Sequence, residues 1–246
     1  MKNIILSAIL LINVQLLSGS DSSEYSQSYT ILIKGTVAGH EKVTEKLDDA
    51  GQLLSASEHE ITVSDGLASK RMVFSTKMVF SKGGYEPVSY TYWYSDGNAG
   101  ASYNVEIKAA QITRNLSRSG RTSEITIPLP PNMVILDFNV YHQYDHLIRR
   151  YDGKKGGKQS FADFIPLIGN DIPLTVSSLG DSNLKSDQGV LPVKNFRVEC
   201  AGLWTGILAV DKNGRLVRLS IPAQDLEVVR SDLIPDQEKT PSPASR

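Results

Sequence analysis

The stretch Pro128–Tyr151, read PLPPNMVILDFNVYHQYDHLIRRY, contains the clearest helical pattern of the chain. Its prolines end the preceding strand, because proline cannot donate a ladder hydrogen bond. Asp137 or Asn139 is expected to cap the helix with a short side-chain acceptor. Apolar residues then recur at helical spacing and predict one buried stripe, with the histidines and charged residues outside it. The stripe consists of Val140, Tyr144, Leu147, Ile148 and Tyr151.

On both sides of this stretch, apolar and polar residues alternate, which is typical of half-buried β-strands. Turns such as Asp96-Gly97 and Asn213-Gly214 separate most strands by too few residues for a parallel crossover. About thirteen such strands cannot remain one flat sheet, because strand twist makes a large sheet curl or close. We therefore predict a mainly β fold: a curved antiparallel meander, either a half-barrel or an open barrel, with one helix packed on its concave face.

The chain begins with a short basic start, an apolar run and small residues before Asp21, which is the pattern of a cleaved secretory signal. Near the other end, Leu226–Arg230 is expected to be a final edge strand, and the polar segment Gly180–Gly189 is expected to be mobile. The last residues contain three prolines and few apolar side chains, which predicts disorder. The expected organisation is a signal peptide over 1–20, a flexible leader over 21–28, a single β domain over 29–230 and a tail over 231–246.

Composition excludes several classes of protein. The formal charge is −1, with 26 basic and 27 acidic residues, whereas a nucleic-acid-binding protein would show a basic excess. After the signal segment no apolar run is long enough to span a bilayer. Cys200 is the one cysteine, so no internal disulfide can form, and its place in an alternating strand predicts a buried thiol. No cofactor is expected, because neither a nucleophile elbow nor a phosphate-binding loop is found.

Two neighbouring strands supply the most apolar faces of the predicted sheet. Met72, Phe74 and Met78 share one face of their strand, and the tyrosines of the next strand form a row on one side. Such a row packs across strands or stacks against a ligand. With the helix stripe, these faces predict the lining of a ligand site: Met72, Phe74, Met78, Tyr90, Tyr92, Tyr94, Tyr144, Leu147 and Ile148.

His142 and His146 lie four positions apart, which places both imidazoles on one side of a helix, as a zinc site requires. The residue after the first histidine is Gln143, which cannot act as the general base of the zincin motif. A third ligand would come from Asp137, His40 or His59. The alternative is a pair of polar residues that are hydrogen-bonded or solvated on the helix flank, and we expect no metal there.

The segment Trp204–Val229, read WTGILAVDKNGRLVRLSIPAQDLEVV, resembles the closing hairpin of uncharacterised bacterial envelope proteins, in which the run from Asp211 to Pro222 is typical. The glycine step from Gly35 to Glu41 is also similar, as is the helix Leu136–Tyr151 followed by Phe161–Pro166. These proteins look like relatives of the periplasmic lipoprotein carriers, which hold acyl chains in a curved antiparallel sheet covered by helix. The resemblance implies the same half-barrel fold, although one helix is found here where the carriers have several.

The sequence leaves three functions open. The first is a non-catalytic binder or carrier of an apolar or lipid-like ligand in the cell envelope, periplasmic or secreted after cleavage of the signal. The second is an envelope assembly or scaffold protein that binds another envelope protein and no small ligand, with its helix as permanent core. The third is a metal-dependent enzyme that uses His142 and His146.

Overall fold

The structure, a computed structural model, describes residues 24–64, 69–186 and 189–234. Over these residues the chain is mainly β and forms one 15-stranded sheet. The strands before the helix are β1 (Tyr25–Ile33), β2 (Thr36–Leu47), β3 (Leu53–Ser64), β4 (Ser69–Phe80), β5 (Pro87–Ser95), β6 (Gly100–Lys108), β7 (Gln111–Arg118), β8 (Arg121–Pro128) and β9 (Met133–Val134). After helix α1 (Gln143–Arg150) come β10 (Lys158–Ile165), β11 (Asn170–Ser186), β12 (Gly189–Cys200), β13 (Trp204–Val210), β14 (Leu216–Ile221) and β15 (Leu226–Arg230).

The order of strands in the sheet is β8-β7-β6-β5-β4-β3-β2-β1-β15-β14-β13-β12-β11-β10-β9. Most successive strands are neighbours because short turns join them, whereas β8 and β9 lie apart and α1 lies between β9 and β10 in the chain. All neighbouring pairs are antiparallel except β9 with β10. The predicted mainly antiparallel sheet is therefore confirmed. The sheet is not closed, since β8 and β9 form its two ends.

Strand β15 lies in the middle of the sheet, where the sequence predicted a final edge strand, so that prediction is wrong. It pairs with β14 on one side and with β1 on the other, in a register that places Arg230 opposite Tyr29 and Leu226 opposite Ile33. The apolar side chains of β15 favour this interior position, and Val228 is fully buried between the two neighbouring strands. This pairing joins the N-terminal and C-terminal parts of the chain into one sheet.

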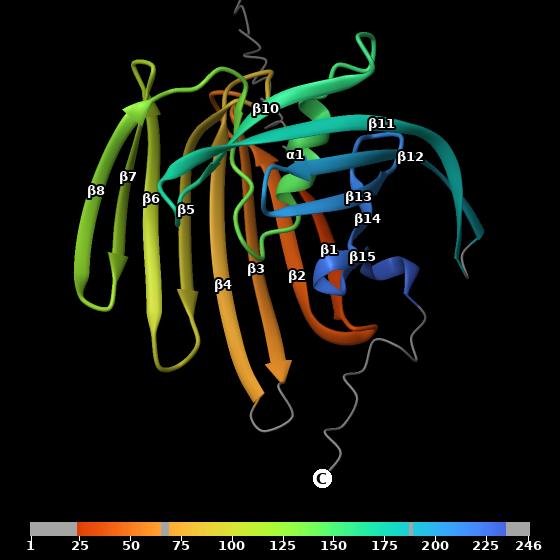
Figure 1. Ribbon diagram of the computed structural model, residues 1–246, viewed down its shortest axis with the longest axis horizontal. Coiled ribbons are helices and arrows are strands. Elements are labelled where there is room, and N and C mark those ends of the chain that lie inside the picture. The colour runs from red at the N-terminus through yellow and green to blue at the C-terminus, as the bar shows by residue number, and fades with distance from the viewer. Residues whose placement is uncertain (1–23, 65–68, 187–188, 235–246) are drawn as a thin grey trace, which may run out of the picture.

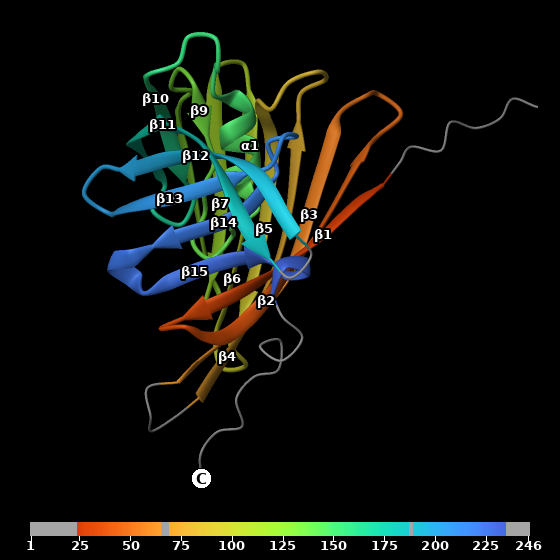
Figure 2. The same ribbon diagram turned by 90° about the vertical axis from the view of Figure 1, so that its right-hand side faces the viewer.

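Helix α1 lies between two parts of the sheet, the long strands β2 to β8 and the strands β10 to β13 (Figure 1 and Figure 2). In Figure 1 the strands β10 to β13 run across the long strands β2 to β8, and the perpendicular view in Figure 2 shows α1 between these groups. The predicted stripe is buried throughout, from Val140 to Tyr151. No helix among the described residues is both long and apolar enough to cross a bilayer.

The helix differs from its prediction in length and in surroundings. It begins after His142, which makes no side-chain cap, and not after Asp137 or Asn139. Residues before it form turns, and Asn139 has a positive φ of 62°, outside helical geometry. The polar residues expected outside the stripe are buried as well, including His142 and Asp145. Helix α1 is therefore covered on most of its circumference.

Two boundaries of the expected organisation also change. Strand β1 begins at Tyr25, within the segment predicted to be a flexible leader. The segment Gly180–Gly189, predicted to be mobile, contains the end of β11 at Ser186 and the start of β12 at Gly189, and the paired strands form a long arm. Two short 3-10 helices, Pro222–Gln224 and Ser231–Leu233, flank β15. The predicted signal peptide and most of the predicted tail lie outside the described residues.

Candidate functional site

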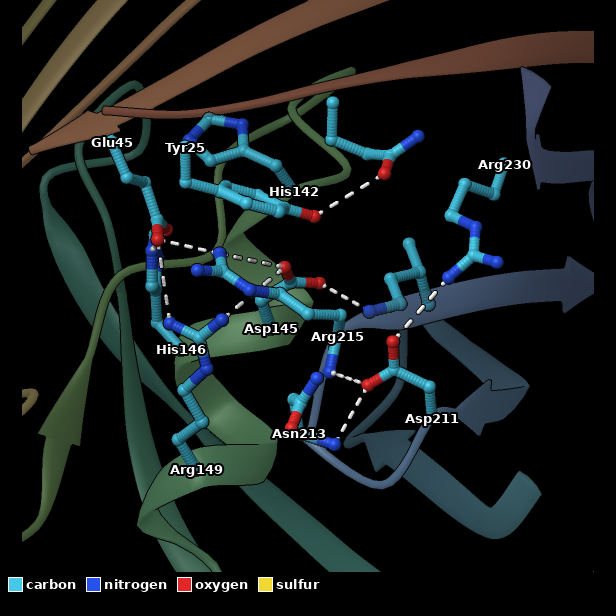
Figure 3. Close-up of polar contacts among 12 residues, drawn as sticks. Tyr25, Glu45, His142, Asp145, His146, Arg149, Asp211, Asn213, Arg215 and Arg230 are labelled. Carbon is cyan, nitrogen blue, oxygen red and sulfur yellow. Dashed lines mark hydrogen bonds and ion pairs between the residues drawn. The ribbon is translucent and has the colours of Figure 1, made fainter. Parts of the chain in front are cut away.

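The polar side of α1 faces buried carboxylates of the sheet. Glu41 and Glu45 on β2 are 0% and 3% exposed, and His142 and His146 on the helix are 1% and 4% exposed. Figure 3 shows part of this network, together with the β13–β14 turn that approaches it from the other part of the sheet. Burial of so many ionisable groups requires partners, because an unpaired buried charge costs several kcal/mol, on the order of its desolvation penalty.

Glu41 holds the start of the helix. Its Oε2 accepts the backbone N–H groups of Tyr141 and His142 at 3.1 and 3.2 Å, and its Oε1 lies 2.7 Å from Nδ1 of His142. The first N–H groups of a helix have no partner inside the helix, and a carboxylate there is also favoured by the helix dipole. A strand residue therefore provides the cap that the sequence assigned to Asp137 or Asn139.

The pKa shifts of this pair favour its ionised form. Burial alone would raise the pKa of the Glu41 carboxyl, but His142 and His59 lower it to about 2. Burial alone would lower the pKa of His142, yet the adjacent Glu41 carboxylate raises it above its usual value. His59 on β3 approaches the same carboxylate, with Nδ1 3.4 Å from Oε1.

Glu45 forms the second anchor of α1. Its Oε1 lies 2.9 Å from Nε2 of His146, and its Oε2 pairs with Arg215 and lies 3.5 Å from Arg149. Burial opposes ionisation, but these partners hold the pKa of Glu45 well below its usual range. Burial lowers the pKa of His146 to about 4, so the neutral ring donates its Nε2–H to Glu45.

Asp145 ties the helix to the β13–β14 hairpin. Its Oδ1 accepts the backbone N–H of Leu216 at 2.7 Å, and its Oδ2 lies 3.8 Å from Arg149 and 3.7 Å from Arg215. Arg149 lies four positions further along the helix, a spacing that places the two side chains on the same side of it. Burial raises the pKa of Asp145 to about 6, although Arg149 opposes this shift. Arg215 also lies 3.5 Å from the ring centroid of Tyr25, so four elements meet at this cluster.

A further buried carboxylate, Asp137, lies in the turn before the helix. The hydroxyl groups of Tyr90 and Tyr103 both donate to its Oδ2, and its backbone N–H donates to Oε1 of Gln143 at 2.6 Å. Burial raises the pKa of Asp137 to about 7. Tyr90, one of the residues predicted to line a ligand site, thus binds the carboxylate of the turn that leads into α1.

The two histidines do not converge on one point. His142 contacts Glu41 and His146 contacts Glu45, and their ring planes are nearly perpendicular with centroids 5.6 Å apart. Among the described residues, no group of three or more histidine, cysteine, aspartate or glutamate side chains is arranged to hold a metal ion. Of the suggested third ligands, His59 contacts the same Glu41 carboxylate as His142, whereas His40 lies near Thr30 and Asp137 contacts two tyrosines.

The residues predicted to line a ligand site gather in the core between α1 and the sheet. Six are buried and three, Met72, Tyr92 and Tyr94, are partly buried against the same core. The buried members are Phe74, Met78, Tyr90, Tyr144, Leu147 and Ile148. They fall into two apolar clusters, with Met78 and Tyr90 in the second one. Their close packing stabilises the fold, by about 1.5–3 kcal/mol for each large apolar side chain.

An open space lies at the C-terminal end of α1. This helix-end pocket has a volume of about 500 Å³ and is bordered by the end of α1, the glycine-rich loop after it, β11, β12 and the β13–β14 turn. Its apolar wall consists of Ile148, Tyr151, Phe196 and Val210, with Tyr85 at one side. Ile148 belongs both to this wall and to the predicted lining.

The anchoring carboxylates and the helix-end pocket were not predicted from the sequence. The alternation of β2 does contain a signal, because Glu41 and Glu45 share the parity of the buried Val43 and so face the core. The pocket had no comparable signal. Its residues come from segments far apart in the chain, and only the pairing of β11, β12 and β13 brings them to the end of α1.

The fold and the site together define a barrel-like, mainly antiparallel β protein with a buried helix. A crystal structure described as a beta-barrel-like protein of domain of unknown function DUF1849, from Brucella abortus, is similar to this chain, with a TM-score of 0.55. The identity is 7%, and the match covers 85% of this chain and 94% of that one, so the likeness concerns the fold alone. No family model matches the sequence, and no curated protein matches it significantly.

Proposed function

We propose that this protein is an exported, non-catalytic binder of an apolar or lipid-like ligand in the cell envelope, and that the helix-end pocket is its binding site. The observation that carries the proposal is the pocket of about 500 Å³ with an aromatic and aliphatic wall. Sites for small ligands have volumes of roughly 300–1,000 Å³, which this pocket matches. Most residues that border it are polar, charged or glycine, and the apolar side chains form one wall. A periplasmic or secreted location agrees with the signal pattern of the sequence.

The half-barrel interpretation and the kinship with lipoprotein carriers belong to the same proposal. They are supported by a large antiparallel sheet with a helix between its two parts. In the carriers the acyl chain lies under the helix, where the predicted lining from Met72 to Ile148 is packed here. A ligand would reach that depth only if α1 moved, and Glu41 and Glu45 anchor it. We therefore place the ligand at the end of α1.

Binding of an uncharged fluorescent probe, N-phenyl-1-naphthylamine, tests the proposal. Gly153 borders the pocket, its φ is not in the left-handed region, and a Cβ built on it meets no atom within 4 Å. Gly153→Trp should therefore fill the pocket without strain and reduce probe binding at least about tenfold, a difference of about 1.4 kcal/mol. Gly153→Ala is the matched control and should bind like the parent protein.

Absence of probe binding in the parent protein, together with native mass spectra that show no bound molecule after purification from the host, would overturn the proposal. Equal binding in the parent and in Gly153→Trp would place the ligand elsewhere.

The assembly or scaffold function remains the second candidate. It is favoured by the buried contacts of His142 with Glu41 and of His146 with Glu45, which anchor α1 to the sheet. Under this alternative, deletion of residues 140–152 unfolds the domain, and neither the probe nor co-purified lipid is found.

A further inference from the structure

We propose that the ligand of the helix-end pocket carries an anionic head group, so that the pocket takes an anionic amphiphile and discriminates against uncharged ones. This inference rests on the proposed function. It names the chemical class of the ligand, in which a phosphate or carboxylate group is attached to a hydrocarbon chain.

The charged residues that border the pocket have a positive excess. Three cations, Arg149, Lys194 and Lys212, and two carboxylates, Asp181 and Asp211, line it, which leaves one net positive charge. A pocket for an uncharged lipid has no need of three cations, whereas an anion gains charge-assisted hydrogen bonds from them.

Two of these five residues are already engaged by the protein. The Oδ2 of Asp211 lies 3.3 Å from Arg230, and its Oδ1 accepts the backbone N–H groups of Asn213 and Arg215 at 2.9 and 3.0 Å. Arg149 lies near Glu45 and Asp145 and donates to the hydroxyl of Tyr85 at 3.2 Å. Figure 3 shows Arg149 and Asp211 directed into this network.

Lys194 and Lys212 are the cations that remain for a ligand. Both side chains are exposed, and within the described part of the chain neither ammonium group has a carboxylate within 4 Å. Asp181 stands opposite Lys194 in the β11–β12 ladder and is the lining carboxylate that opposes them. Because the two lysines come from β12 and from the β13–β14 turn, they border the pocket from two elements.

The loop after the helix carries two further lysines next to residues that border the pocket. Lys154 and Lys155 lie between Gly153 and Gly156, which both border the pocket. The backbone N–H groups of the two lysines donate to Oδ1 of Asp152 at 2.9 and 3.2 Å, so the loop has a defined turn that holds them there. Exposed charges of one sign at the mouth of a pocket raise the local concentration of the opposite ion.

The apolar wall decides between a free anion and an amphiphile. Tyr151 and Phe196 are 9% and 5% exposed and contact each other edge to face, with centroids 5.2 Å apart. These side chains leave only a small remainder of apolar surface in water, which a hydrocarbon chain would cover and inorganic phosphate would not. The cations and the wall together therefore fit a ligand with one charged end and one apolar end.

The experiment is displacement of N-phenyl-1-naphthylamine from the full chain by dodecyl phosphate, by uncharged monododecanoylglycerol and by inorganic phosphate. Dodecyl phosphate should displace the probe at an about tenfold lower concentration than monododecanoylglycerol, a difference of about 1.4 kcal/mol. The double variant Lys194→Gln/Lys212→Gln should lose this preference. The control Lys42→Gln/Lys77→Gln removes two exposed lysines of β2 and β4 and should keep it. The preference should also decrease as salt rises, because salt screens exposed charges.

Equal displacement by the charged and uncharged amphiphiles would overturn the anionic head group and leave the proposed function intact. Displacement by inorganic phosphate at the same concentration as dodecyl phosphate would overturn the amphiphile in favour of a free anion. If the parent protein binds no probe and no amphiphile, the proposed function fails, and this inference fails with it.

Discussion

The Nδ1 atom of His142 lies 2.7 Å from Oε1 of Glu41, a residue 101 positions earlier in the chain. Both side chains are buried, and the other oxygen of Glu41 accepts two backbone N–H groups at the start of α1. One carboxylate of β2 thus caps the helix, fixes the histidine and links the helix to the sheet. The position of α1 depends on this contact as well as on its apolar stripe.

Replacing Glu41 by glutamine tests the cap. The variant keeps the size of the side chain but removes the charge that partners His142 and two N–H groups. Breaking a buried pair leaves an uncompensated charge, so we expect the free energy of unfolding in urea to fall by about 3–5 kcal/mol. Glu58→Gln, at an exposed position of β3, should change it by less than about 0.5 kcal/mol. A similar small effect of both variants would show that the cap contributes little.

Asp137 should give the protein a specific pH dependence. Its folded pKa of about 7 lies above the ordinary value of 3.8, so its contribution to stability is fully present below pH 3.8 and is lost as the pH rises through 7. The variant Asp137→Asn stays neutral at every pH. The stability of the parent relative to this variant should therefore fall between pH 4 and pH 8, by up to about 4 kcal/mol. Chemical denaturation at several pH values measures the difference, and Asp49→Asn, on an exposed turn, controls for the loss of one charge. A difference that does not change with pH would contradict the prediction.

Gly39 in β2 should tolerate no side chain. Ile31 pairs with Gly39 and Leu32 with Val37, so a bulge lies at this position, and β3 approaches closely. A Cβ on Gly39 would overlap the carbonyl oxygen of Glu60 and lie 2.9 Å from Cα of Ile61. We expect Gly39→Ala to lower the free energy of unfolding by about 3 kcal/mol, because the neighbouring backbone must shift. Gly153→Ala, in open space, should be neutral in the same measurement.

Val228 tests the central place of β15. It is fully buried and pairs with Ile31 of β1 and Leu219 of β14. Truncation of Val228 to alanine removes apolar contacts on a strand that joins both parts of the sheet, and should cost about 2–3 kcal/mol. Val190→Ala on the arm, where the side chain is 63% exposed, should have almost no effect. Equal stability of the two variants would mean that β15 behaves as an edge strand.

The strands were predictable from sequence because alternation is local. Met78 and Phe80 face the core and Lys77 faces solvent, as their parity requires. The place of β15 was not predictable, because Leu226–Arg230 shows only that it is a strand, whereas its partners are set by β1, almost 200 residues earlier. Tertiary pairing, and not local pattern, decides which strand lies at an edge.

The helix was likewise predictable where its pattern is local and not where it depends on distant residues. Its apolar stripe was predicted correctly, since 3.6-residue periodicity is visible in the sequence. Its polar residues were predicted only to lie outside the stripe, with the histidines hydrogen-bonded or solvated, because polar residues are exposed unless partners are present. Those partners, Glu41, Glu45 and Arg215, lie far away in the chain. The helix-end pocket was not predicted for the same reason, because the residues that line it come from segments far apart in the chain.

The pairing of β1 with β15 brings the first and last described strands of the chain together in the sheet. The two open ends of the sheet, β8 and β9, are covalently consecutive, whereas the first and last strands meet through hydrogen bonds. Since Arg230 lies opposite Tyr29, a short linker between β15 and β1 would turn this pair into an ordinary hairpin. A circular permutant opened between Pro128 and Met133 would then run from β9, through α1, to β8, with every strand next to its predecessor in the sheet. Its refolding should be faster than that of the parent, because the pairing of β1 with β15 changes from the longest contact in the chain to a local one.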